Sequence, residues 1–144
     1  MDYLMVHANV LPTKAIISKI KKLKNGEFLT SGNEGAMAYK FSNKEIQGLH
    51  KIKINNPVVF KGEMKAIHYP WQIFQLNDWA LRQDFELLTT GRKSRAVSAT
   101  NKLINPSQIF IEAGVQMKHC FINADEGPVY IGKNALIMEG CMLR

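Results

Sequence analysis

Few residues of this sequence have the spacing of a catalytic or metal site. The four histidines show no metal-ligand spacing and no serine, cysteine or aspartate partner at motif distance: they are His7, His50, His68 and His119. The two cysteines, Cys120 and Cys141, lack a CxxC partner, which argues against a zinc site and a disulfide scaffold. We therefore expect His119 to be a surface or core histidine and the cysteines to be small apolar core residues.

Two asparagines stand where a polar side chain could bind a ligand. Asn9 directly follows the first apolar run, and Asn77 lies in a long stretch with helical spacing. An amide oxygen is neutral and is a weaker ligand for Mg²⁺ than a carboxylate. From the residues alone, Asn9 is equally well explained as a turn residue that ends a strand. Asn77 is better explained as the N-cap of the helix that follows it.

The elements that hold Asn9 predict an α/β beginning. Residues 3–7 form a short apolar run, typical of a strand buried on both faces. Residues 12–24 repeat apolar side chains at helical spacing, with proline at the start. Strands at 27–30 and 36–41, joined by the glycine-bearing turn at 31–35, predict a hairpin.

The stretch that holds Asn77 carries the strongest helical signal. Residues 42–49 predict a short helix with a capping box, and residues 51–60 are ambiguous between strand and loop. Residues 70–90 then place large apolar side chains on one stripe, formed by Trp71, Phe74, Leu81, Phe85 and Leu88. We expect the aromatic residues Trp71, Phe74, Trp79 and Phe85 to be core or domain-interface residues. A helix break at 77–78 is an alternative, and residues 92–105 are polar, as in an extended linker.

A different pattern begins after residue 106. Aliphatic residues recur every six positions at Ile131, Ile137 and Leu143, which is the hexapeptide repeat of a parallel β-helix. Ile111 precedes Ile131 by one coil of three such units plus two residues, and the turn residues at 125–128 can hold that insertion. An ordinary β-meander with accidental spacing is the alternative.

The bulk composition limits the partners. The formal charge of +7 comes largely from residues 14–24 and from Arg92, Lys93 and Arg95, which favours polyanions or a solvated helix face. No aromatic residues interleave with the lysines, so single-stranded nucleic acid is not the expected partner. No apolar run is long enough to span a membrane, and the N-terminus lacks the basic region of a signal peptide. We expect a cytoplasmic protein.

Three segments resemble a known family. They are Val6-His-Ala-Asn-Val-Leu-Pro12, then Tyr69-Pro-Trp-Gln-Ile-Phe-Gln-Leu-Asn77 running into 84–89, and Ile109-Phe-Ile-Glu-Ala-Gly114 through 127–133. Together they resemble the alternative bacterial form of the bifunctional UDP-N-acetylglucosamine pyrophosphorylase/glucosamine-1-phosphate N-acetyltransferase. Members of that family are also described as sugar (glucose-1-phosphate) nucleotidyltransferases.

The resemblance implies a Rossmann-like α/β nucleotidyltransferase domain followed by a left-handed parallel β-helix. Residues 1–91 would be the C-terminal part of the α/β domain, 92–108 a linker and 109–144 the first coils of the β-helix. The Gly-rich phosphate loop of the family is absent, and many further coils would be expected after residue 144. The resemblance therefore implies an internal fragment that contains no catalytic residue and is inactive in isolation.

The resemblance also implies ligands and site residues. Related enzymes place a Mg²⁺-binding aspartate at the end of a strand like that before Asn9, so Asn9 is expected as a substrate-binding residue and a weak metal ligand. Asn77 corresponds to a second metal- or sugar-binding position. Mg²⁺ is the cofactor expected in the parent enzyme, and acetyl-CoA would bind coils beyond this segment. The partners implied are a sugar 1-phosphate, a nucleoside triphosphate and two further copies forming a trimer through the β-helix.

Three functions follow as hypotheses. The first is transfer of a nucleotidyl group to a sugar 1-phosphate in cell-envelope sugar-nucleotide synthesis, with an acetyltransferase activity in the same parent protein. The second is a non-catalytic assembly module that trimerises through the β-helix. The third and weakest is a basic nucleic-acid-binding protein, which would show binding that falls steeply with salt.

Overall fold

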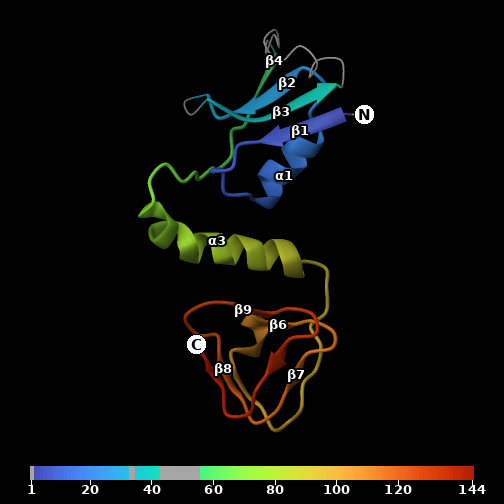
Figure 1. Cartoon of the computed structure of the whole chain (residues 1–144), viewed down its shortest axis with the longest axis vertical. Helices are drawn as coiled ribbons and strands as arrows, with labels where there is room; N and C mark the ends of the chain where they lie inside the picture. The colour runs from blue at the N-terminus through green and yellow to red at the C-terminus, as the bar shows by residue number, and fades with distance from the viewer. Residues whose placement is uncertain (1, 33–34, 43–55) are drawn as a thin grey trace. The chain divides into compact units, whose positions relative to one another are not determined.

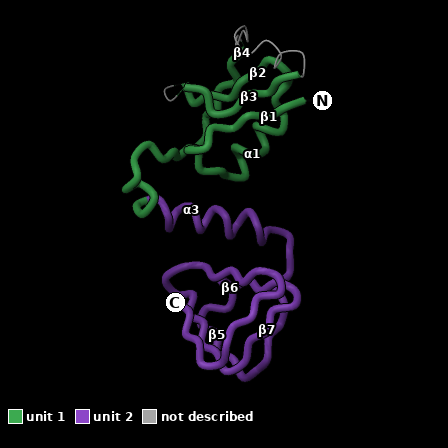
Figure 2. Tube along the Cα trace, viewed as in Figure 1, with its two compact units in different colours: residues 1–75 green, residues 76–144 purple. Residues whose placement is uncertain are grey.

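The structure, a computed structural model, describes residues 2–32, 35–42 and 56–144. The chain divides into two compact units, Met1–Gln75 and Leu76–Arg144, coloured separately in Figure 2. The helix predicted at 42–49 lies, apart from Ser42, outside the described residues, as does most of the ambiguous segment before residue 56. Each unit has its own hydrophobic core.

Unit 1 is built on a four-stranded sheet of order β1-β3-β2-β4 (Figure 1). Its strands are β1 (Asp2–Val6), β2 (Glu27–Thr30), β3 (Ala36–Ser42) and β4 (Asn56–Val59). β3 runs antiparallel to both β1 and β2, and β4 is parallel to β2. The two strands predicted as a hairpin are therefore confirmed as an antiparallel pair.

The helix of unit 1, α1 (Lys14–Lys21), is capped and amphipathic. Thr13 has an extended backbone, and its hydroxyl accepts a hydrogen bond from the Ile16 amide at 3.2 Å, which satisfies one of the free donors of the first turn. Ile16 and Ile20, one turn apart, are buried, whereas the helix lysines are exposed. The core also contains Leu23, Leu29, Met37, Ala38 and Phe60.

β1 forms as predicted, but its predicted burial is wrong. All five of its residues are exposed, with Met5 at 54% and Val6 at 49%. The physical reason is its place in the sheet: β1 is an edge strand that pairs with β3, so one side of its backbone has no described neighbour. An apolar run shows that a strand can be buried on both faces, but it does not determine what covers them.

α3 (Gln72–Thr89) is one continuous helix, which begins in the last residues of unit 1 and lies mostly in unit 2. No break occurs at 77–78, so Asn77 is an interior helix residue and not an N-cap. The helix has no buried residue, and Trp71 and Phe74 are 57% and 84% exposed. Their expected burial in a core or interface is not found within the described residues.

The rest of unit 2 winds as short parallel strands (Figure 1). Ile109 pairs with Val129, and Lys102 with Phe121, so successive turns of chain lie side by side about 20 residues apart. The elements are β5 (Lys102–Ile104), the 3₁₀ turn η2 (Pro106–Gln108), β6 (Ile109–Ile111), β7 (Gln116–Met117), β8 (Phe121–Asn123), β9 (Val129–Ile131), β10 (Leu136–Ile137) and β11 (Met142–Leu143).

Three small parallel sheets result: β5-β8-β11, β6-β9 and β7-β10. Ile111 is paired with Ile131, the two residues that the sequence places one coil and two residues apart. Both side chains are buried in one cluster with Cys120 and Ile122, which are fully buried. The Cys120 prediction is thus confirmed, whereas the Rossmann-like and left-handed β-helix descriptions stay predictions.

Candidate functional site

Asn9 lies in the turn that follows β1. The His7 amide donates to the Met37 carbonyl at 2.8 Å, which extends the contact of β1 with β3 by one residue. The Val10 amide then donates to the His7 carbonyl at 3.2 Å, closing a turn around residues 8 and 9. The half-buried side chain of Asn9 is thereby held at the carboxyl end of β1.

A second segment lies beside this turn. The Asn9 carbonyl accepts from the Ile67 amide at 2.8 Å, and the Leu11 amide donates to the Lys65 carbonyl at 2.9 Å. Val10 and Ala66 form an isolated antiparallel bridge between them. These bonds bring residues 64–68 against the end of β1, although they are more than fifty positions later in the sequence.

The two segments and β3 enclose a hollow of about 250 Å³. Four of its lining residues carry hydrogen-bonding side chains: His7, Asn9, Tyr39 and His68. Imidazole, amide and phenol groups can each donate or accept, which suits the hydroxyl groups of a sugar or the oxygens of its phosphate. The structure brings Asn9 together with two histidines that have no metal-ligand spacing in the sequence.

These residues do not fit a dedicated Mg²⁺ site. Mg²⁺ prefers carboxylate and water oxygens in octahedral geometry. The described lining of the hollow contains no carboxylate, and Asn9 supplies one neutral amide oxygen. Across the described part of the chain, no three His, Cys, Asp or Glu side chains gather where they could hold a metal ion. The described side chains around this hollow are therefore not suited to hold Mg²⁺.

Asn77 belongs to unit 2, whereas Asn9 belongs to unit 1. Asn77 is exposed in the middle of α3. The next residue, Asp78, forms an ion pair with Arg82 one turn later at 3.0 Å. The two asparagines thus lie in different units, and Asn77 does not line the hollow around Asn9.

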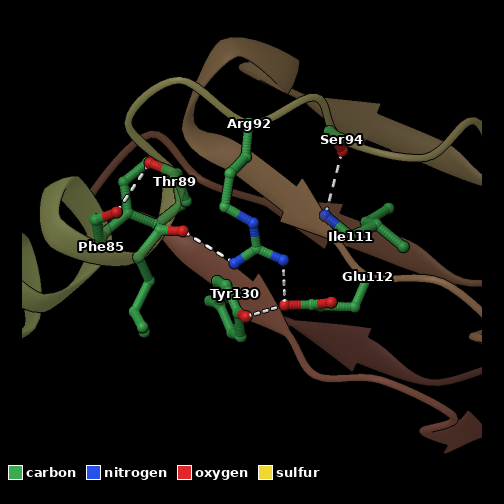
Figure 3. Close-up of polar contacts among 8 residues, drawn as sticks. Phe85, Thr89, Arg92, Ser94, Ile111, Glu112 and Tyr130 are labelled. Carbon is green, nitrogen blue, oxygen red and sulfur yellow. Dashed lines mark hydrogen bonds and ion pairs between the residues drawn. The ribbon is translucent and has the colours of Figure 1, made fainter.

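Unit 2 contains a polar cluster that the sequence did not predict (Figure 3). Arg92 follows α3 and donates to the Leu88 carbonyl at 2.8 Å and to Glu112 Oε1 at 2.6 Å. The Tyr130 hydroxyl donates to the same carboxylate oxygen. The Arg92 guanidinium also lies over the Phe110 ring, 5.0 Å from its centre. Three segments far apart in the sequence thus meet at one carboxylate.

The electrostatics of this cluster favour the ionised carboxylate. The hydrogen bond from Tyr130, and after it that from Arg92, lowers the pKa of Glu112. The same ion pair raises the pKa of Arg92, with Glu112 as the largest cause. Glu112 is only 17% exposed, against 44% for Arg92, so it is the more enclosed partner. The arrangement holds a fixed charge pair and leaves no free base.

The segment after Arg92 is hydrogen-bonded to strand β6. The Ile111 amide donates to the Ser94 hydroxyl at 3.0 Å (Figure 3). The Arg95 amide donates to the Ile111 carbonyl at 2.9 Å. Residues 94 and 95 therefore run beside β6 and satisfy its outer backbone groups. The sequence showed this segment as a basic, polar linker, but it gave no signal for Glu112 and Tyr130 as partners.

Comparison with known proteins decides the family. Residues 1–93 match the family described as sugar nucleotidyl transferase. The chain belongs to this family. The matched region of the chain includes Asn9, Asn77 and Arg92, whereas Glu112 and Tyr130 lie outside it.

The chain is also similar to a plant protein. Over 112 residues it is 25% identical to "Protein LURP-one-related 1" of Arabidopsis thaliana, covering 74% of this chain and 46% of that protein. The chain thus spans about half the length of this curated relative. That protein's name states no ligand or reaction. Within the described residues, no helix has the length and apolar character needed to cross a bilayer.

Proposed function

We propose that unit 1 binds the sugar 1-phosphate of a nucleotidyl transfer reaction. In that reaction, a phosphate oxygen of the sugar 1-phosphate attacks the α-phosphorus of a nucleoside triphosphate. The new P–O bond forms as the bond to the β-phosphate breaks, and pyrophosphate leaves. Such a transfer depends on holding the two phosphates in line, so side chains that position the sugar contribute directly to the rate.

The observation that carries this proposal is the polar hollow at the end of β1, inside the region that matches the family. Its four hydrogen-bonding side chains are uncharged or weakly basic, which suits a polyhydroxylated ligand with one phosphate. Asn9 is half-buried and its backbone carbonyl is already bonded to Ile67, so the side-chain amide is held in place and available to a ligand. His68 and Tyr39 face the hollow from the neighbouring segments.

The resemblance to the UDP-N-acetylglucosamine pyrophosphorylase family suggests which sugar phosphates to test as ligands. N-Acetylglucosamine 1-phosphate, the sugar phosphate that a UDP-N-acetylglucosamine pyrophosphorylase joins to the nucleotide, and glucose 1-phosphate are the ligands to test. Titration of the chain with each, followed by NMR, tests binding without requiring turnover. We expect shifts of the Asn9 amide signals and a dissociation constant that rises roughly tenfold in Asn9→Ala, the usual cost of losing a hydrogen bond to a charged or polar ligand group.

Asn77→Ala is the matched control, because it removes the same side chain from an exposed helix position. We expect it to leave binding unchanged. Equal losses in the two variants, or no binding of either sugar phosphate by the unmodified chain, would contradict the proposal. In a longer protein with turnover, Asn9→Ala should also lower the rate more than Asn77→Ala.

A second function, assembly, is favoured by one surface of unit 2. On the parallel sheet β5-β8-β11, Phe121 and Met142 are register partners and are 51% and 78% exposed, and Ile104 lies on the same sheet at 40%. Exposed apolar side chains in a row are typical of an interface. We infer that unit 2 contains coils of a left-handed β-helix and associates as a trimer through this sheet.

Sedimentation equilibrium tests this second proposal. We expect a trimer for the unmodified chain and a monomer for Phe121→Ser combined with Met142→Ser. Leu136→Ser, which changes a side chain 73% exposed on a different sheet, is the control and should remain trimeric. A monomeric unmodified chain would show that this surface does not mediate assembly.

A further inference from the structure

Two adjoining hollows lie along the segment that follows α3 and runs beside β6. One, of about 320 Å³, is lined by Arg92, Lys93 and Arg95 together with residues 110–113. The other, of about 380 Å³, is lined by residues 93–96. Lys93 and Arg95 line both, so their side chains face a shared concave surface.

The charge on this surface is strongly unbalanced. Three cationic side chains line the first hollow and Glu112 is its single acidic residue. One oxygen of Glu112 already accepts hydrogen bonds from both Arg92 and Tyr130. Arg92 is in turn held by Glu112 and the Leu88 carbonyl, so its charge is largely compensated. The uncompensated charge therefore belongs to Lys93 and Arg95.

Three arginines of unit 2 form ion pairs, and Arg92 is one of them. Arg82 is paired with Asp78 at 3.0 Å, and Arg144 with Glu126 at 2.7 Å. Within the described residues, neither Lys93 nor Arg95 has a carboxylate within 4.0 Å. Both are exposed on a segment whose backbone is fixed to Ile111. Two unpaired cations on a fixed backbone form a preorganised site for an anion.

The chemistry of these groups indicates phosphate. A guanidinium offers paired donors that match phosphate oxygens, and an ammonium adds a compact charge. The Ser94 hydroxyl accepts from the Ile111 amide and still has its own proton to donate. Two cations two positions apart suit an anion with two charged centres better than a single small ion.

We propose that Lys93 and Arg95, on the segment fastened to β6, bind the diphosphate group of a pyrophosphate or nucleotide ligand. The site lies entirely in unit 2 and does not depend on the hollow around Asn9. Free pyrophosphate and the phosphate chain of a nucleoside triphosphate share the recognised chemistry. Arg92 serves by holding the segment against Glu112, since its guanidinium already donates to Glu112 and to the Leu88 carbonyl.

Isothermal titration of the full chain with inorganic pyrophosphate tests this site. We expect binding that weakens with added salt, because exposed charges are screened. Combining Lys93→Ala with Arg95→Ala should raise the dissociation constant roughly tenfold or more, since two charge-assisted contacts are removed. Both side chains are exposed and neither variant alters a backbone bond, so the fold should survive, as amide dispersion in NMR spectra would show.

The matched control combines Lys102→Ala with Lys118→Ala. Both lysines are exposed in unit 2 and neither lines the two hollows, and the net charge falls by the same amount. The control should keep the affinity of the unmodified chain. Equal losses in the two double variants would mean that net charge alone attracts the anion. That result, or no pyrophosphate binding at all, would overturn the proposal.

Two further arms identify the source of the diphosphate. If UTP competes with bound pyrophosphate, the site also accepts the phosphate chain of a nucleotide. If UTP does not compete, the site is specific for free pyrophosphate. Both results support a diphosphate site. A short oligothymidylate that binds much more tightly than pyrophosphate, and loses that binding in the Lys93 and Arg95 double variant, would overturn it. The surface would then be a nucleic-acid interface.

Discussion

Truncating a large, fully buried side chain of unit 2 should destabilise that unit strongly. Ile122 is fully buried, and its strand pairs on both sides, with Leu103 in β5 and Leu143 in β11. Replacing a buried isoleucine by alanine removes apolar contacts and leaves a cavity, which typically costs about 2–5 kcal/mol. Because Ile122 has no exposure, we expect about 3–4 kcal/mol for Ile122→Ala.

That loss is large for a unit of this size. At roughly 0.05–0.15 kcal/mol per residue, residues 76–144 have a stability of about 3–10 kcal/mol. A loss of about 3–4 kcal/mol corresponds to a rise of roughly 10²–10³ in the open population, at about 1.4 kcal/mol per factor of ten. Hydrogen exchange measures this directly, because protected amides in a cooperative unit exchange through its opening.

The coil amides report on the change. The Lys102 amide donates to the Cys120 carbonyl at 2.8 Å, and the Gln116 amide to Ala135 at 2.9 Å; both should exchange roughly 10²–10³ faster in Ile122→Ala. The Leu11 amide, bonded to Lys65 in unit 1, is an internal reference and should keep its rate. Dilute protein keeps association from contributing to protection.

Leu136→Ala is the control, because it deletes the same number of carbon atoms from a side chain that is 73% exposed. It should change the exchange rates by less than about tenfold, as surface substitutions usually cost within about 0.5 kcal/mol. If Leu136→Ala accelerated exchange as much as Ile122→Ala, the burial argument would be refuted. If the Leu11 amide accelerated equally, the two units would not be independently stable.

Two further predictions concern a turn and a carboxylate. Gly114 has φ +78°, and a Cβ there would lie 2.0 Å from Asn134 Oδ1. Gly114→Ala should therefore lower the free energy of unfolding, measured with denaturant, by roughly 1–3 kcal/mol. Gly132→Ala, which has open space around the added Cβ, should change it little. Glu112, whose pKa is lowered by Tyr130 and then Arg92, contributes stability that is fully present above the ordinary carboxyl range and is lost as the pH falls through the lowered pKa. Glu112→Gln should therefore differ from the unmodified chain near neutral pH and converge with it in acid.

The sequence predicted the local elements where one period dominates. The two strands of unit 1 at 27–30 and 36–41 and the helix over 70–90 all form within two residues of their expected bounds. The sequence also placed Ile111 and Ile131 one coil apart, with a two-residue insertion, and the two are register partners in the structure. In each case the pattern is set by the backbone repeat, which a sequence displays directly.

The polar cluster could not be predicted in the same way. Arg92, Glu112 and Tyr130 are about twenty residues apart, and they meet because neighbouring coils align Phe110 with Tyr130 and place Glu112 one residue beyond Ile111. Aliphatic spacing determines which residues point into the core, but not which polar residues on the outside become neighbours. The apolar pattern was wrong about the burial of β1, whose apolar side chains are exposed on an edge strand.

The charge of Glu112 should affect the stability of unit 2 and the affinity of the proposed anion site in opposite directions. Its carboxylate fastens Arg92 and Tyr130, and it is also the one acidic group in the described lining of the hollow that holds Lys93 and Arg95. Removing its charge loosens the fastening but leaves the cations less compensated. Glu112→Gln, which keeps the size and hydrogen-bonding capacity of the side chain, should therefore bind pyrophosphate more tightly at neutral pH although the unit is less stable. A purely structural role for Glu112 would instead weaken binding together with stability, so the two measurements on one variant separate electrostatic recognition from support of the fold.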